Sequence, residues 1–113
     1  VCGVNYLIIQ QKLREMVLYG CIALRQLPRA ELHVLSAEIR TSMLKLLKLV
    51  ITAAKRHHKK TTLTDMDVEL AALQSQLRLA KELGYLPMKK YQLWTGMNVE
   101  IGRLLGGWLR AQN

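Results

Sequence analysis

Apolar residues recur at intervals of three and four along most of the chain, which is the spacing of one face of an α-helix. The pattern predicts a first helix from about Val4 to Leu24, which stops before Pro28 because proline disfavours helical backbone at the residue that precedes it. A second predicted helix runs from about Glu31 to His57, and a polar connection, His58–Leu63, follows it. Two helices therefore account for the first half of the chain.

The second half of the chain predicts two further helices. Thr64 followed by Asp67 resembles a capping box at the start of the third helix, and Gly84 is a natural terminator at its end. Pro87 suits the first turn of the fourth helix, which runs to about Arg110. Such short connections make successive helices antiparallel neighbours. The sequence predicts an all-α fold, an antiparallel up-and-down four-helix bundle that occupies residues 1–113 as one domain.

The third predicted helix is apolar on two sides rather than one. Its apolar positions form two separate arcs, Val68, Ala72, Leu79, Leu83 and Leu86 on one side and Met66, Leu70, Leu73, Leu77 and Ala80 on the other. A helix that is apolar so widely is usually buried on two sides, which in a small bundle requires another subunit. We therefore expect a homo-oligomer, although a wide single core with surplus surface leucines would leave the same pattern.

The charge of the chain is strongly basic and unevenly distributed. Seventeen Lys and Arg against eight Asp and Glu give a net charge of +9, while a hydrophobic content of 50% excludes a disordered basic tail. Residues 39–64 hold seven bases and no acid: Arg40, Lys45, Lys48, Lys55, Arg56, Lys59 and Lys60. Such clustering favours a polyanion such as RNA or DNA as the partner, and a merely solvated lysine face is the alternative.

Candidate catalytic and metal-binding patterns are missing from the sequence. It contains no Cys-x-x-Cys, no pair of histidines four residues apart and no glycine-rich phosphate loop, so we expect no enzyme, metal or cofactor. Cys2 and Cys21 would lie about 28 Å apart on one helix, too far for a disulfide, which favours a reducing cytoplasm. The longest uncharged stretch, Val1–Gln11, is far shorter than the roughly 20 residues of a membrane span.

The end of the fourth predicted helix carries a distinctive run of residues, Glu100-Ile101-Gly102-Arg103-Leu104-Leu105-Gly106-Gly107-Trp108-Leu109-Arg110. This run resembles the C-terminal signature of the accessory variability determinant (Avd) proteins of diversity-generating retroelements. They belong to a wider four-helix-bundle family that includes proteins encoded by intervening sequences in rRNA genes. The similarity continues through Leu77–Leu86, at Leu27-Pro28-Arg29 and at Ile39-Arg40, so it covers nearly the whole chain.

The resemblance implies a non-enzymatic homopentamer, a ring of five bundles around a positively charged channel. It also implies association with the retroelement reverse transcriptase and with nucleic acid, notably the template RNA, during mutagenic copying. Members often carry two basic residues a turn apart on the third helix; here Arg78 occupies one place, whereas Gln74 stands at the other. Arg78 therefore joins the candidate nucleic-acid-binding residues. A relative of the intervening-sequence type, a structural homo-oligomer with no dedicated nucleic-acid role, remains the alternative.

Overall fold

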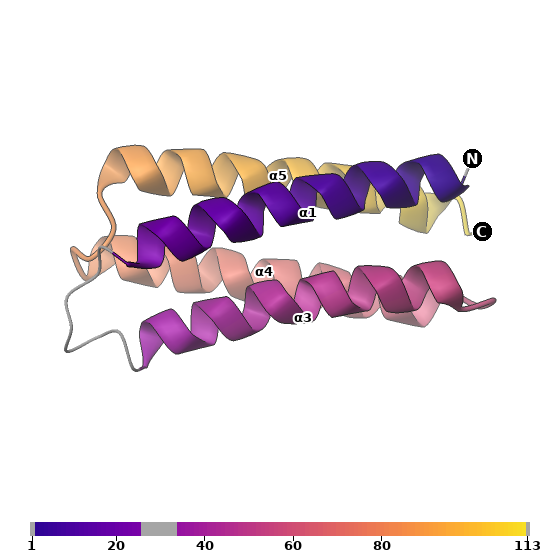
Figure 1. Cartoon of the computed structure of the whole chain (residues 1–113), viewed down its shortest axis with the longest axis horizontal. Coiled ribbons are helices and arrows are strands. Elements are labelled where there is room, and N and C mark those ends of the chain that lie inside the picture. The colour runs from indigo at the N-terminus through magenta and orange to yellow at the C-terminus, as the bar shows by residue number, and fades with distance from the viewer. Residues whose placement is uncertain (1, 26–33, 113) are drawn as a thin grey trace.

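The computed structural model describes residues 2–25 and 34–112, and within these ranges it contains four α-helices and no strand. The helices are α1 (Cys2–Leu24), α3 (Leu35–Lys55), α4 (Lys60–Glu82) and α5 (Met88–Arg110). They pack side by side as a bundle in which the start of α1 and the end of α5 lie at the same end (Figure 1). The prediction of an all-helical, four-helix fold is confirmed.

Each helix of the bundle has two neighbours. α1 packs against α3 and α5, and α4 packs against the same two helices, so α1 and α4 occupy opposite corners (Figure 1). The core between them contains the predicted apolar stripes of α3 and α5, including Ile39, Met43, Trp94 and Trp108, each of which is almost fully buried. Burial of these large side chains supplies the main stabilising term of the bundle.

One residue of α1 fits the core only because it has no side chain. An added Cβ at Gly20 would lie 2.6 Å from Cζ2 of Trp94 and 2.7 Å from Sδ of Met43. Tyr19, its neighbour, meets the Trp94 ring edge-on, with 6.0 Å between ring centroids. Gly20 therefore lets α1 approach the indole of α5 and the thioether of α3 closely.

The connection between α3 and α4 is shorter than the sequence predicted. The second helix was expected to reach His57, but α3 ends at Lys55 because Arg56 has an extended backbone (φ −88°, ψ 146°). The expected helix start at Glu31 lies outside the described residues. The expected capping box at Thr64 and Asp67 is wrong: α4 already begins at Lys60, and the Thr64 hydroxyl donates a hydrogen bond of 2.8 Å to the Lys60 carbonyl inside the helix.

The end of α4 agrees with the sequence prediction. Gly84 has a left-handed backbone (φ +82°), its N–H donates to the Lys81 carbonyl and the Tyr85 N–H donates to the Ala80 carbonyl. These two hydrogen bonds form a Schellman motif, which satisfies carbonyls that the helix end would otherwise leave unpaired. Pro87 then precedes α5, which begins at Met88.

Candidate nucleic-acid interface

The outward side of α3 carries three exposed basic residues of the predicted cluster. Lys45, Lys48 and Lys55 are exposed on this helix, opposite the buried row that includes Ile39 and Met43. A shallow hollow of about 660 Å³ follows this side of the helix, lined by Thr41, Leu44, Lys45, Lys48, Leu49, Thr52 and Arg56. The helix therefore presents ammonium groups along an open surface that a rod-shaped or extended polyanion can follow.

Two predicted anion-binding residues are instead engaged in the turn between α3 and α4. Nζ of Lys59 donates to the carbonyls of Arg56 at 2.6 Å, Ala53 at 2.8 Å and Ala54 at 3.4 Å. Nη1 of Arg56 donates to Oγ1 of Thr62 at 3.2 Å. The Lys59 ammonium thus caps the C-terminal end of α3, where the helix dipole is negative. We therefore assign Lys59 and Arg56 a structural role, in which their side chains stabilise the turn between α3 and α4.

Ion pairs occupy two more of the predicted residues. Nζ of Lys45 lies 3.5 Å from a carboxylate oxygen of Glu69 on α4, and Nε of Arg78 lies 3.7 Å from a carboxylate oxygen of Glu82 on its own helix. Arg78 belongs to α4 rather than to the exposed side of α3, so the structure does not bring it into the lysine cluster. The Arg78–Glu82 pair is exposed on both sides, and such pairs contribute little to stability, whereas the Glu69 side chain that holds Lys45 is only 16% exposed.

The side chains of four predicted residues, Arg40, Lys48, Lys55 and Lys60, have no hydrogen-bond or ion-pair partner among the described residues. Lys48 and Lys55 project from the outward side of α3, where Lys55 is the last residue of the helix, and Lys60 is the first residue of α4. Arg40 lies about 80° around α3 from Lys48 at 100° per residue, on the flank turned away from α4. The two free lysines of α3 are therefore the centre of the candidate interface.

Gln74 explains why the second basic position of the third helix is not basic here. Its side chain is half-buried, and its Oε1 accepts a hydrogen bond of 2.9 Å from Nδ2 of Asn98, a residue buried on α5. The same Asn98 amide donates to the Leu70 carbonyl at 3.2 Å. The side chain of Gln74 therefore joins α4 to α5, and the position is used for packing between helices.

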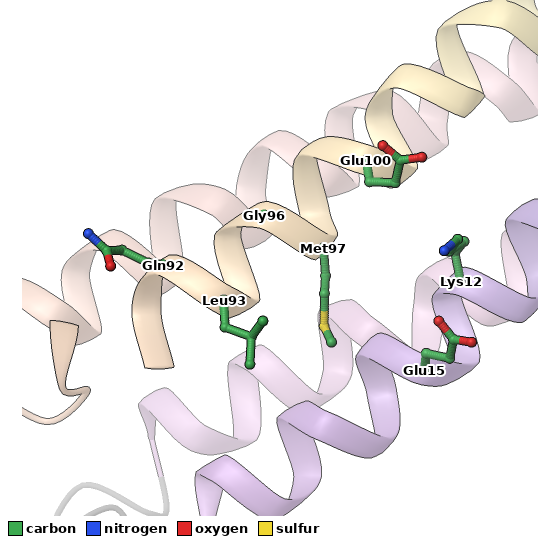
Figure 2. Close-up of a pocket in the computed structure, with 7 residues that line it drawn as sticks. All are labelled: Lys12, Glu15, Gln92, Leu93, Gly96, Met97 and Glu100. Carbon is green, nitrogen blue, oxygen red and sulfur yellow. The ribbon is translucent and has the colours of Figure 1, made fainter. Parts of the chain in front are cut away.

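A second hollow, about 350 Å³ in volume, lies between α1 and α5 (Figure 2). Lys12 and Glu15 reach it from α1, while Leu93, Met97 and Glu100 border it on α5. The Arg103 guanidinium donates to the Glu100 carboxylate at 2.7 Å and, with smaller contributions from its charge and that of Lys12, holds the pKa of that carboxyl below its usual value. Both signs of charge surround this hollow, so it does not attract a polyanion.

The described residues contain neither a group of potential metal ligands nor a helix that could cross a membrane. Across residues 2–25 and 34–112, no three His, Cys, Asp or Glu side chains converge in a way that could hold a metal ion. Within the same ranges, none of the helices combines the length and the apolar character that crossing a membrane requires. His57 and His58 lie together in the turn, with 4.8 Å between their ring centroids.

Sequence reasoning overlooked one basic residue near the candidate interface. Arg14 is exposed on α1, the helix that packs beside α3, and borders a hollow with Gln10, Gln11 and Leu18. Only the knowledge that α1 adjoins α3 could have brought Arg14 into consideration, because it is far from the basic segment in the chain.

The four helices and the exposed lysines of α3 define a small, basic, all-helical protein over the described residues. A family model described as bAvd-like matches residues 7–112, nearly the whole chain. The chain therefore belongs to the bAvd-like family, and its resemblance to the Avd accessory proteins is confirmed. A search of curated proteins returned no match.

Proposed function

We propose that this protein is a non-enzymatic accessory subunit that binds nucleic acid and associates with a retroelement reverse transcriptase and its template RNA during mutagenic reverse transcription, in the cytoplasm. One observation carries the nucleic-acid part of the proposal: Lys48 and Lys55 project freely from α3, within a segment that holds no carboxylate between Glu38 and Asp65. Membership of the bAvd-like family supports the accessory role.

The physical basis of binding is neutralisation of phosphates and release of their counterions. Lys45, Lys48, Lys55 and Lys60 supply four contacts if the Lys45 ion pair opens. With about 0.7 counterions released per contact to a single strand, affinity falls about 50-fold between ~50 and ~200 mM salt. Phosphates of RNA and DNA are recognised alike, and the described surface of α3 offers no aromatic ring on which a base could stack.

The proposal includes the assembly. Consecutive helices run antiparallel in one domain, which is supported by the short connections and by the start of α1 and the end of α5 lying at the same end (Figure 1). Five copies form a ring with a basic channel, as the family resemblance implies. The large exposed apolar side chains on all four helices, such as Leu18, Leu44, Val68 and Val99, support burial against other copies.

A comparison of two charge-reversed variants tests the binding site. Lys48→Glu with Lys55→Glu reverses the centre of the candidate interface, whereas Lys89→Glu with Lys90→Glu changes the net charge equally at the start of α5, at the opposite end from the α3–α4 turn (Figure 1). We expect the first pair to reduce affinity for single-stranded RNA at least 10-fold in filter binding and to lower the salt slope by about 1.4. The second pair should have a much smaller effect.

Two outcomes would contradict the proposed binding. Equal losses in both variants would show that only the overall charge matters and that α3 is not the binding surface. Absence of RNA binding by the unaltered protein at ~50 mM salt would favour the alternative function, a structural homo-oligomer of the intervening-sequence type. Association with the reverse transcriptase is measured separately, by co-purification from cells that express both proteins.

A further inference from the structure

Two exposed apolar surfaces of the bundle supply none of the proposed phosphate contacts. The first, here called the α1–α3 face, consists of Arg14 and Leu18 on α1 with Arg40, Leu44 and Ile51 on α3. It borders the candidate interface, because Leu44 lines the same hollow as Lys45 and Lys48. Leu18 is 65% exposed and Leu44 is 56% exposed. Isolated exposed leucines are ordinary on a soluble protein, but a contiguous group marks a binding surface.

Several contacts place these residues on one surface. Lys45 reaches Glu69 of α4, so the opposite flank of α3, where Leu44, Ile51 and Arg40 lie, is turned toward α1. Glu15 borders the hollow shared with α5, so Arg14, about 100° around α1, lies on the flank turned toward α3.

The residues on the two helices also lie at similar levels along the bundle axis. A Cβ on Gly20 would touch Met43, so these two positions lie at the same level along the bundle. Leu18 and Leu44 stand two residues and one residue away from that contact, on neighbouring helices. Their exposed side chains therefore lie close together along the bundle axis.

The second surface, here called the α4 stripe, consists of Asp65, Val68, Leu79 and Leu83. Val68 is 63% exposed and Leu79 is 48% exposed. They lie on the outer of the two apolar arcs predicted for this helix; the inner arc, which includes Met66 and Leu73, fills the core. At 100° per residue no Lys or Arg falls between Asp65 and Val68 on this side of the helix, so its one charge is negative.

The charges decide which surfaces can meet. The two charged residues of the α1–α3 face, Arg14 and Arg40, are both bases, so two copies of it would bring like charges together. The α4 stripe is apolar and carries a carboxylate. Glu15 also lines the hollow beside Arg14 and Leu18, but it lies on the flank of α1 turned toward α5. We propose that the α1–α3 face of one copy binds the α4 stripe of a second copy, with leucine packed on leucine and valine and with Arg14 or Arg40 beside Asp65. The inference rests on the self-association included in the proposed function.

An interface between two different surfaces has a structural consequence. Each copy that binds a neighbour still offers one unused surface of each kind, so association continues until a ring closes or a filament grows. α3 lies between α1 and α4, so the two surfaces are not on opposite sides of the bundle. Each added copy is therefore rotated in the same sense relative to the one before it, which favours a closed ring over a straight filament.

A mixing experiment with two variants tests the pairing. Leu18→Asp with Leu44→Asp disables the α1–α3 face, and Val68→Lys with Leu79→Lys disables the α4 stripe; all four positions are exposed, so the helical fold should persist. By light scattering we expect the unaltered protein to be an oligomer and each variant alone to be a monomer of 12.9 kDa. A 1:1 mixture should form a dimer of twice that mass and nothing larger, because one intact surface of each kind remains.

Circular dichroism first establishes that each variant is helical. A folded variant that stays fully oligomeric, a mixture that remains monomeric, or an unaltered protein that is itself monomeric would each overturn the pairing. Filter binding of RNA to the unaltered protein is measured in the same buffer. Loss of RNA binding with a correct mixing result would refute the proposed function alone, whereas RNA binding with a failed mixing result would refute only this interface.

Discussion

Replacement of Gly20 by alanine is expected to destabilise the bundle, although alanine is the better helix former. In the interior of an exposed helix, Gly→Ala is favourable by about 1 kcal/mol. At Gly20 the new methyl group would stand 2.6 Å from Trp94 and 2.7 Å from Met43, whereas ordinary contacts of this kind begin near 3.4 Å. α1 or the indole ring must therefore move by several tenths of an ångström.

A second glycine, Gly96, serves as the reference for the size of this destabilisation. Gly96, in the middle of α5, has no heavy atom within 4 Å of the position that a Cβ would take, so Gly96→Ala should gain the full helical preference (Figure 2). Gly20→Ala gains the same preference but adds a cost of overpacking of about 1–3 kcal/mol. The two variants should therefore differ in unfolding free energy by about 1–3 kcal/mol, with Gly96→Ala the more stable.

Thermal unfolding followed by circular dichroism measures this difference. For a chain of this size, ~1 kcal/mol corresponds to a shift in Tm of about 4 °C, so the two Tm values should be separated by roughly 4–12 °C. Protein concentration must be equal in both experiments, because self-association stabilises the folded state. Equal Tm values would refute the close approach of α1 to Trp94, because a buried position with that contact could not accept a methyl group as easily as the exposed position of Gly96.

Three further substitutions test other features. Lys59→Met removes the ammonium that three carbonyls share and should lower the unfolding free energy by about 1–2 kcal/mol; an unchanged urea midpoint would contradict its capping role. Arg103→Gln removes the hydrogen bond that lowers the pKa of Glu100, a pairing that stabilises the folded state above about pH 4.5 and is lost as the pH falls. The Tm difference from the unaltered protein should accordingly be present at pH 7 and vanish in acid. Asn98→Asp places a carboxylate against the Leu70 carbonyl and the Gln74 amide oxygen, and should cost more than about 2 kcal/mol at pH 7, with part recovered at low pH as the carboxyl protonates.

The sequence predicted the buried side of α3 and α5 but not that of α1 or α4. On α3 and α5 the apolar residues favour one arc, so positions such as Ile39 and Trp94 could be assigned to the core. On α4 two apolar arcs were predicted, and only the structure shows that the arc with Leu73 is the buried one. On α1 the apolar residues surround the helix, and of the apolar positions only a subset, which includes Ile9 and Leu13, is buried, while Leu7 is exposed. Periodicity cannot choose a face when every face is apolar, and the choice depends on which neighbours the helix meets.

The α3–α4 turn was mispredicted because a local capping pattern pointed to the wrong start of α4. Thr64 and Asp67 have the residue types and spacing of a capping box, but α4 starts a full turn earlier. Lys59 folds back onto the end of α3, and Thr62 at the start of α4 accepts from Arg56, so contacts between the two helices fix the boundary. No pattern within the segment 58–67 shows these contacts, because they depend on the other helix.

The same limitation applies to the candidate interface, and it changes how the basic segment is understood. Charge counting finds seven bases in residues 39–64 but cannot separate those that join helices from those that remain free. Lys45 is paired with Glu69, which lies 24 residues further along the chain, and Lys59 caps α3; both help to fix α3 against α4. The free ammonium groups of Lys48 and Lys55 are then held on a helix whose position is set by the other charges of the same segment. A substitution at Lys59 should therefore act on RNA affinity only through stability, whereas one at Lys48 should act on affinity alone.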